Sequence, residues 1–129
     1  MNKGDVYVHE FTVSASVYEQ FIDLFNDRNP LHTDECFAIS KGFKSVVMHG
    51  NILNGFISYF VGELLPLKNV IIQTQEIKYS HPVYVNDILK FTAEISGVYE
   101  SVRSIEFKFN FRNTNLEKVS KGKILIGII

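Results

Sequence analysis

The sequence predicts an α+β fold in which an antiparallel sheet wraps around one long buried helix. Two observations support this prediction. Apolar residues recur with a helical period in the first half of the chain, and from Pro66 onward they alternate with a period of two. The elements follow the order of one strand, then helices, then at least four strands, which is typical of a meander sheet packed on a helix.

Length and composition limit what this protein can be. At 129 residues, 46% of them hydrophobic, we expect a single domain over residues 1–129 with a substantial core. The formal net charge is −1 with no block of like charge, so we expect a small molecule and not nucleic acid as the partner. No apolar run is long enough to cross a membrane, and Cys36 is the only cysteine. A reducing cytoplasm is the expected compartment.

The first strand is expected over residues 5–11 and the first helix over residues 16–26. Ser16 and Glu19 have the spacing of a capping box. The helix should end near Asp27, because Pro30 disfavours helical backbone at the residue before it and lacks an N–H. Its apolar face is formed by Tyr18, Phe21, Ile22 and Phe25.

Two more helices follow in the pattern. Thr33 or Asp34 can cap a short helix that ends at about Lys41. A third helix begins just after Gly50 and ends before Pro66, with an apolar stripe so wide that we expect the helix to be largely buried. A separate set of small residues on the same helix would allow a backbone or a ligand to approach closely. These small residues are Gly55, Ser58 and Gly62.

The second half of the chain predicts strands. Apolar and polar residues alternate over residues 105–112 and 89–95, and weaker strands are expected over residues 70–79 and 119–128. A sheet of this size covers only one face of the central helix. Because the apolar surface left over needs a cover, we expect a homodimer, the commonest soluble oligomer.

The segment NDRNPLHTD, residues 26–34, contains the first candidates for chemistry. Asp27 stands at a helix end, Asn29 and Pro30 turn the chain, and His32 returns from the turn, so both side chains can face one point. A carboxylate and an imidazole that share one water can activate it and deliver a proton. The simpler interpretation is an ordinary helix stop followed by a half-buried histidine.

His49 and Gly50 form the second candidate, at the start of the long helix. The first N–H groups of a helix lack partners within it and carry partial positive charge, so the Gly50 N–H could polarise a carbonyl oxygen. The simpler interpretation is a plain helix start. A metal site from His32, Asp34 and His49 would fit no familiar ligand spacing, and we expect none.

Together these segments resemble the MaoC-like (R)-specific enoyl-CoA hydratases. The motif D-x-N-P-x-H-x-D is present, with sixteen residues between its histidine and the one in His-Gly. The similarity continues through residues 79–83 and 86–89 and covers most of the chain. The residues that carry it are Asp27, Asn29, Pro30, His32, Asp34, Ala38, Phe43, Val47, His49 and Gly50.

The resemblance implies a hot-dog fold, an antiparallel sheet curled around a central helix, with the sheets of two copies joined in a homodimer. It implies a hydro-lyase without a cofactor that adds water syn to a trans-2-enoyl thioester of coenzyme A (CoA) or acyl carrier protein, giving the (R)-3-hydroxyacyl product. By position, Asp27 would be the principal acid–base group and His32 would orient and help deprotonate the water. The Gly50 N–H would bind the thioester oxygen.

The resemblance implies lesser roles for three more residues. Ser58 matches a family serine near the reacting groups. Asn29 would order the turn, and His49 would fix the loop before the helix or contact the thioester end of the substrate.

Three positions depart from the family pattern. Asn26 stands where a glycine commonly precedes the aspartate, Arg28 is bulky and charged, and Asn51 is polar where an apolar residue is frequent. These departures put the local backbone and the polarity of the pocket mouth in doubt.

Two other functions stay open. A hot-dog thioesterase would need an acid on or beside the central helix, and Glu63, the only one there, lies more than three turns from its start. A subunit that binds acyl thioesters without turnover is the second. The lysines at 118, 121 and 123 could contact the phosphates of CoA or an acidic carrier protein, although a solvated strand face is the simpler interpretation.

Overall fold

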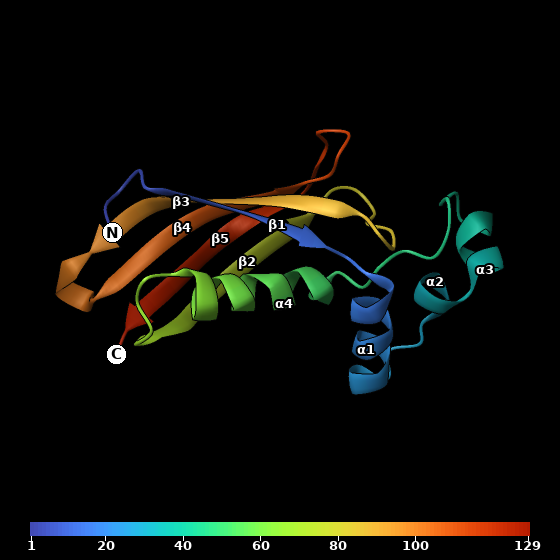
Figure 1. The fold of residues 1–129 in the computed structure, drawn as a ribbon, viewed down its shortest axis with the longest axis horizontal. Helices are drawn as coiled ribbons and strands as arrows, with labels where there is room; N and C mark the ends of the chain where they lie inside the picture. Colours follow the sequence, from blue (N-terminus) through green and yellow to red (C-terminus); the bar gives the residue numbers. More distant parts are fainter.

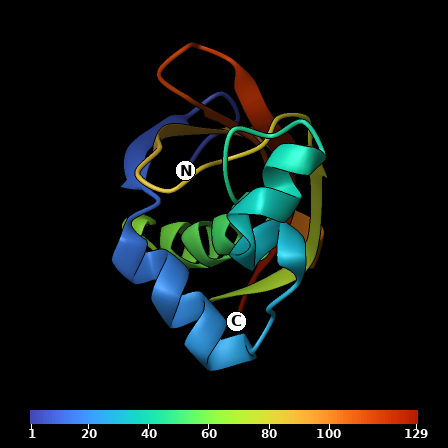
Figure 2. The ribbon, with the colours of Figure 1, turned by 90° about the vertical axis from the view of Figure 1, so that its right-hand side faces the viewer.

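A computed structural model describes residues 1–129 and shows a five-stranded antiparallel sheet with one long helix on one face (Figure 1). The remaining helices gather beyond the N-terminal end of that long helix, as Figures 1 and 2 both show. The strands are β1 (Val6–Thr12), β2 (Val70–Tyr79), β3 (Ile88–Tyr99), β4 (Ser104–Arg112) and β5 (Lys118–Ile128). The α-helices are α1 (Ala15–Phe25), α2 (Pro30–Thr33), α3 (Glu35–Ser40) and α4 (Asn51–Tyr59), and α4 continues into a π-helical turn, Phe60–Leu64.

All five expected strands are present, but the prediction of a meander is only partly right. Their order in the sheet is β1-β3-β4-β5-β2, so only β3, β4 and β5 follow one another as neighbours. In the chain, α4 comes after β1 and before β2. In space, it lies across one face of the sheet (Figure 1). The chain therefore re-enters the sheet at the far edge, beside β5.

The core lies between α4 and the inner faces of β3 and β4. On both strands every second side chain is buried, as the alternation predicts. The Phe60 ring meets Phe91 and Phe107 at centroid distances of 4.9 and 5.5 Å. Burying one such side chain stabilises the fold by roughly 1.5–3 kcal/mol. The inner-face residues are Leu89, Phe91, Ala93, Ile95, Ile105, Phe107, Phe109 and Phe111.

The central helix is less buried than expected. Its sheet-facing side is covered, but Phe56 and Leu64 are only half-buried and the opposite side is exposed. Nothing lies within 4 Å of a Cβ placed on Gly55 or Gly62. A five-stranded sheet reaches around one side of a helix, so in a single chain the small residues face open space.

The first helix begins one residue earlier than predicted and has a different cap. Ser14, not Ser16, is the N-cap, and its side chain accepts a hydrogen bond from the Val17 N–H. Ser16 instead accepts one from Gln20. Two serines two residues apart offer alternative caps, and the sequence pattern alone selected the wrong one.

The region after α1 contains a helix that the sequence analysis missed. α1 ends at Phe25 with Asn26 as its C-cap, close to the predicted end near Asp27. Pro30 itself stands in the first turn of α2, where its missing N–H is not needed. Asp34 caps α3 as expected by accepting from the Phe37 N–H. No helix of this chain has both the length and the apolar character needed to cross a membrane.

Candidate active site

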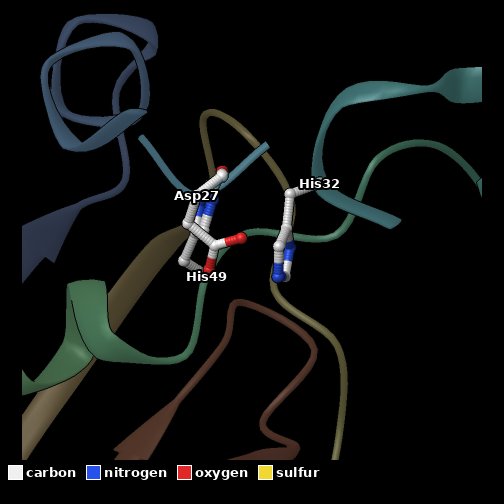
Figure 3. Close-up of side chains that lie close together, drawn as sticks. All are labelled: Asp27, His32 and His49. Carbon is white, nitrogen blue, oxygen red and sulfur yellow. Dashed lines mark hydrogen bonds between the residues drawn. The ribbon is translucent and has the colours of Figure 1, made fainter. Parts of the chain in front are cut away.

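Three side chains from separate segments meet beyond the N-terminal end of α4. Asp27 follows α1, His32 lies on α2, and His49 precedes α4. A carboxylate oxygen of Asp27 and one ring nitrogen of each histidine lie within 4.8 Å of one another. The carboxylate of Asp27 faces the His32 ring (Figure 3). The structure thus brings together the two residues that the sequence analysis paired and adds His49 to them.

Asn26 sets the direction in which the chain leaves α1. Its backbone is left-handed, with φ 57° and ψ 25°, and its N–H donates to the Ile22 carbonyl. Glycine adopts this conformation freely, and asparagine is among the few other residues that visit it routinely. Asn26 differs from the glycine of the family pattern, but its backbone adopts the conformation that a glycine would have.

The turn that follows is held by two side chains. An oxygen of Asp27 accepts a hydrogen bond from the Asn29 N–H at 3.3 Å, and the Asn29 side chain accepts one from the Leu31 N–H at 3.0 Å. Asn29 thereby caps α2, which agrees with its expected part in ordering the turn. The bulky Arg28 faces solvent, and its main-chain carbonyl accepts a hydrogen bond from the Thr33 hydroxyl at 3.0 Å.

His32 is fixed in one tautomer by its contacts. Its Nδ1 lies 2.6 Å from the Val47 carbonyl oxygen, which can only accept, so Nδ1 carries the hydrogen. In the neutral ring Nε2 then holds a free lone pair. The backbone carbonyl of His32 accepts a hydrogen bond from the Tyr18 hydroxyl at 2.6 Å. Burial, with a smaller contribution from Glu19, raises the pKa of Tyr18, so this hydroxyl keeps its proton.

His49 connects the other two residues. It is 3% exposed, and its Nε2–H donates to the main-chain carbonyl of Asp27 at 2.8 Å. Its ring stacks on His32 with a centroid distance of 4.0 Å and packs against Phe21 at 4.7 Å. The remaining nitrogen, Nδ1, is buried and has no hydrogen-bond partner. This side chain holds the loop before α4 against the turn that carries Asp27.

Gly50 presents a free donor at the start of α4. Its N–H donates to no group in the chain, and the residue lines the same cavity as His32 and His49. A Cβ at this position would lie 2.9 Å from the Tyr79 ring. A side chain here would therefore collide with the tyrosine, so the close approach of Tyr79 explains why this residue is a glycine.

A cavity of about 480 Å³ opens beside these groups. Its other wall is the segment that continues from β2, residues 79–83, and most of its lining is apolar. Asp27 itself lines a neighbouring groove of about 690 Å³ between α1 and α4. The apolar side chains that line the cavity are Val13, Phe43, Val47, Met48, Ile52, Leu53, Pro82 and Val83.

Polar side chains between the cavity and the groove form a network that the sequence analysis missed. Asn54 donates to the Tyr79 hydroxyl at 3.3 Å and to Asn51 at 2.7 Å, and it accepts from Gln75 at 2.6 Å. Burial raises the pKa of Tyr79, and the hydrogen bond from Asn54 lowers it by less. Asn51, noted as a departure, is a member of this network. Only the polar residues inside an apolar helix, Asn51 and Asn54, could have hinted at it.

Ser58 is the one candidate that lies apart. It is on the exposed side of α4, two turns after Gly50, and lines neither the cavity nor the groove. In a single chain it cannot reach the group formed by Asp27, His32 and His49.

The cluster also offers three groups of the kind that bind metal ions. Asp34, one of the ligands considered from the sequence, caps α3 instead. The carboxylate of the cluster is that of Asp27. The His32 and His49 rings are stacked with an interplanar angle of 27°. Each lone pair lies in its own ring plane, and the planes of two rings stacked 4.0 Å apart do not meet at an ion within bonding distance of both nitrogens. This arrangement favours proton transfer over metal binding.

Comparison with known proteins assigns this chain to a family. The model of the MaoC like domain matches residues 3–116. An (R)-specific enoyl-CoA hydratase from Rhodospirillum rubrum is 32% identical over 97 residues, which cover 75% of this chain and 67% of the relative. A protein of the same name from Aeromonas caviae is 34% identical over 86 residues, 67% of this chain and 64% of the relative. The match thus spans about two thirds of each relative.

Solved structures share the whole fold. The (R)-hydratase from A. caviae superposes with a TM-score of 0.90 at 23% identity, covering 100% of this chain and 98% of that one. An R-hydratase from Pseudomonas aeruginosa gives 0.89 at 23% identity, covering 99% and 82%. These neighbours confirm the predicted hot-dog architecture.

Proposed function

This chain belongs to the MaoC-like domain family, and from that membership we propose that it catalyses the reversible syn hydration of a trans-2-enoyl thioester to an (R)-3-hydroxyacyl thioester. It acts as a hydro-lyase on thioesters of CoA or of acyl carrier protein, without a cofactor. The observation that carries the proposal is that Asp27 lies within 4.8 Å of His32, which lines the same cavity as Gly50 with its free N–H.

The proposed step follows from the state of the side chains. Water lies between Asp27 and the free Nε2 of His32, and its oxygen bonds to C3 of the enoyl group as the C2=C3 π bond breaks. The water proton passes to this pair, and a proton is delivered to C2 on the same face. Asp27 acts as the principal acid–base group, while the bond from His32 Nδ1 to the Val47 carbonyl keeps Nε2 available.

Addition at C3 places negative charge on the thioester oxygen. The Gly50 N–H, free of any partner in the chain, is proposed to donate to that oxygen. A donor positioned in advance stabilises the transition state more than the substrate, and removing one such donor typically slows an enzyme by about 10²–10³-fold.

We propose a homodimer as the working form. β2 has ten residues and pairs only with β5, so its other edge is open. Natural proteins seldom leave a strand edge of this length uncovered. Leu24 and Phe25 on α1 are 73% and 62% exposed, beside the groove that Asp27 lines. A second copy would join the two sheets through their β2 edges, and by covering the outer side of α4 it would shield Asp27 from bulk water.

We also propose the cytoplasm as its location. The free thiol of Cys36 is exposed, and an exposed unpaired cysteine keeps its reduced form in a reducing compartment. Fractionation followed by immunodetection of the tagged protein checks this directly.

The experiment that tests the function follows the absorbance of the enoyl-thioester band with crotonyl-CoA and with a longer trans-2-enoyl-CoA. We expect the absorbance to fall, and a stereospecific 3-hydroxyacyl-CoA dehydrogenase should oxidise the product as the (R) isomer. Release of free thiol would instead identify a thioesterase. Binding of both thioesters without turnover would leave the role of a binding subunit.

A further inference from the structure

The outer face of the sheet carries a set of basic side chains that the proposed reaction does not use. On β4 the phenylalanines point to the core, so Lys108, Asn110 and Arg112 point outward, and the register places their cross-strand partners on the same side. We call the cations gathered there the basic face. They are Lys78, Lys90, Lys108, Arg112, Lys118, Lys121 and Lys123.

These seven cations stand directly opposite one another. The register pairs Lys78 with Lys121 and Lys108 with Lys123. Arg112 is paired with Lys90 on one side and with Lys118 on the other. Like charges directly opposite on neighbouring strands destabilise a sheet.

The acids on the basic face are too few to match its charge, because three glutamates stand against seven cations. The single ion pair in the structure joins His81 and Glu117 at 3.4 Å and involves no lysine or arginine. The register places Glu10 opposite Lys90 and Glu94 opposite Lys108. It also places Glu76 opposite Lys123. Since the whole chain has 13 basic and 14 acidic residues, the rest of the surface is clearly acidic. The other four cations, Lys78, Arg112, Lys118 and Lys121, have no acid opposite them. Such an excess of one charge costs stability and is typical of a binding surface.

The basic face adjoins the cavity of the proposed active site. Lys78 is followed by Tyr79, which lines that cavity. The Lys118 carbonyl accepts a hydrogen bond at 3.3 Å from Nδ1 of His81, another residue of the cavity wall. A partner on the basic face therefore sits next to the cavity opening.

The size of the basic face indicates the kind of partner. Adjacent strands lie about 4.8 Å apart, so four strands and three rows span roughly 14 by 14 Å. An α-helix is about 10–12 Å wide and sets side chains at i and i+4 about 5–6 Å apart, so an acidic helix laid across the strands would place one carboxylate near each cation of one row. The phosphates of a CoA molecule would use only a corner of the face. No aromatic side chain points outward among these rows to stack on a nucleic-acid base.

We propose that the basic face docks an acidic helical protein that carries the acyl thioester, so that the substrate class is an acyl group on a carrier protein. This inference rests on the proposed function and decides between the two carriers it allows. The carrier lies on the outside of β3, β4, β5 and β2, and its thioester-bearing arm reaches around the end of β2 into the cavity.

The test uses the double variant Lys118→Glu and Lys121→Glu. Each substitution turns a pair of like charges, with Arg112 and Lys78, into a pair of opposite charges and opposes no acid. The control is Lys3→Glu with Lys41→Glu, two exposed lysines away from the sheet rows that change the net charge equally. Hydration is measured with crotonyl groups on CoA and on an acidic acyl carrier protein, together with thermal unfolding.

We expect the double variant to raise KM for the carrier-borne substrate about tenfold, with kcat/KM for crotonyl-CoA within about twofold, because opposite charges steer this encounter. Its melting temperature should rise, since two repulsive pairs become attractive. The control should match the wild type in all three. Equal losses on both substrates, or no loss on either, would overturn the inference.

Failure of the proposed function gives a different result. In that case the wild type hydrates neither thioester, and binding of the carrier protein is measured directly by fluorescence anisotropy. If the wild type binds the carrier protein and the double variant does not, the docking surface is supported. If the wild type does not bind the carrier protein, the docking surface is contradicted. It is also contradicted if the double variant loses only its binding to anionic vesicles or to single-stranded DNA.

Discussion

His49 is the residue whose importance emerges only from the three-dimensional contacts. Its Nε2–H holds the Asp27 carbonyl while its ring lies on His32, so one buried side chain fixes the spacing of the proposed acid–base pair. Displacing reacting groups by a fraction of an ångström can slow an enzyme severely without changing how tightly the substrate binds.

His49→Phe keeps a flat ring for stacking but removes the donor, and His49→Gln offers an N–H near the position of Nε2. We expect His49→Phe to lower kcat about tenfold or more with KM within about twofold, and His49→Gln to recover most of the loss. Steady-state hydration kinetics of the two variants check this. Equal kcat values for both would mean that the hydrogen bond to Asp27 has no part in positioning.

At the residue scale, the sequence could predict that Asp27 and His32 face each other, because a helix stop and a proline turn leave few other arrangements. It could not predict that His49 bonds to Asp27, since a backbone contact between residues 22 apart leaves no pattern in the chain. Asn26 shows the opposite case. It differs from the family glycine in sequence and yet takes the left-handed backbone that a glycine would take.

Among the elements, α1 is where the prediction chose the wrong cap. Ser14 accepts from the Val17 N–H, while Ser16 only bonds to an exposed glutamine side chain. We expect Ser14→Ala to lower the unfolding free energy by about 1 kcal/mol and Ser16→Ala by less than about 0.5 kcal/mol. Urea unfolding measures both, and a larger loss for Ser16→Ala would restore the capping box that the sequence suggested.

The strands were predictable and their order was not. Alternation over residues 105–112 reports which face of β4 is buried, because the period of side chains along a strand is two. The place of β2 at the far edge depends on where α4 delivers the chain, and this is set by packing on β3 and β4. Short helices such as α2 escape detection because four residues cannot show a period.

At the scale of the whole molecule, the open side of α4 gives a direct test of the dimer. Gly55 and Gly62 have nothing within 4 Å of a Cβ, and glutamate is a better helix former than glycine. We expect the double substitution Gly55→Glu and Gly62→Glu to leave the chain folded and to convert a dimer into monomers with lowered activity. Analytical ultracentrifugation measures the mass, and an unchanged dimer would place the interface elsewhere.

Alkaline pH should weaken the fold through its tyrosines. Burial raises the pKa of Tyr7, Tyr18 and Tyr79, so the folded chain holds these phenolic protons more tightly than the unfolded chain, where tyrosine ionises near pH 10. Their stabilisation is fully present below about pH 10 and is lost as the pH rises through the raised values. Tyr18→Phe should flatten the decline in unfolding free energy above about pH 10, and an identical slope in this variant would contradict the assignment.

The most direct test of the central claim compares Asp27→Asn with Asp34→Asn. Both remove one carboxylate from the same nine-residue segment, but asparagine caps α3 as well as aspartate does, so Asp34→Asn should keep its fold and its activity. With crotonyl-CoA and with the carrier-borne thioester, we predict that Asp27→Asn and His32→Ala each lower kcat about 10³-fold while Asp34→Asn stays near the wild type. Hydration that persists in Asp27→Asn would contradict the acid–base role on which this account rests.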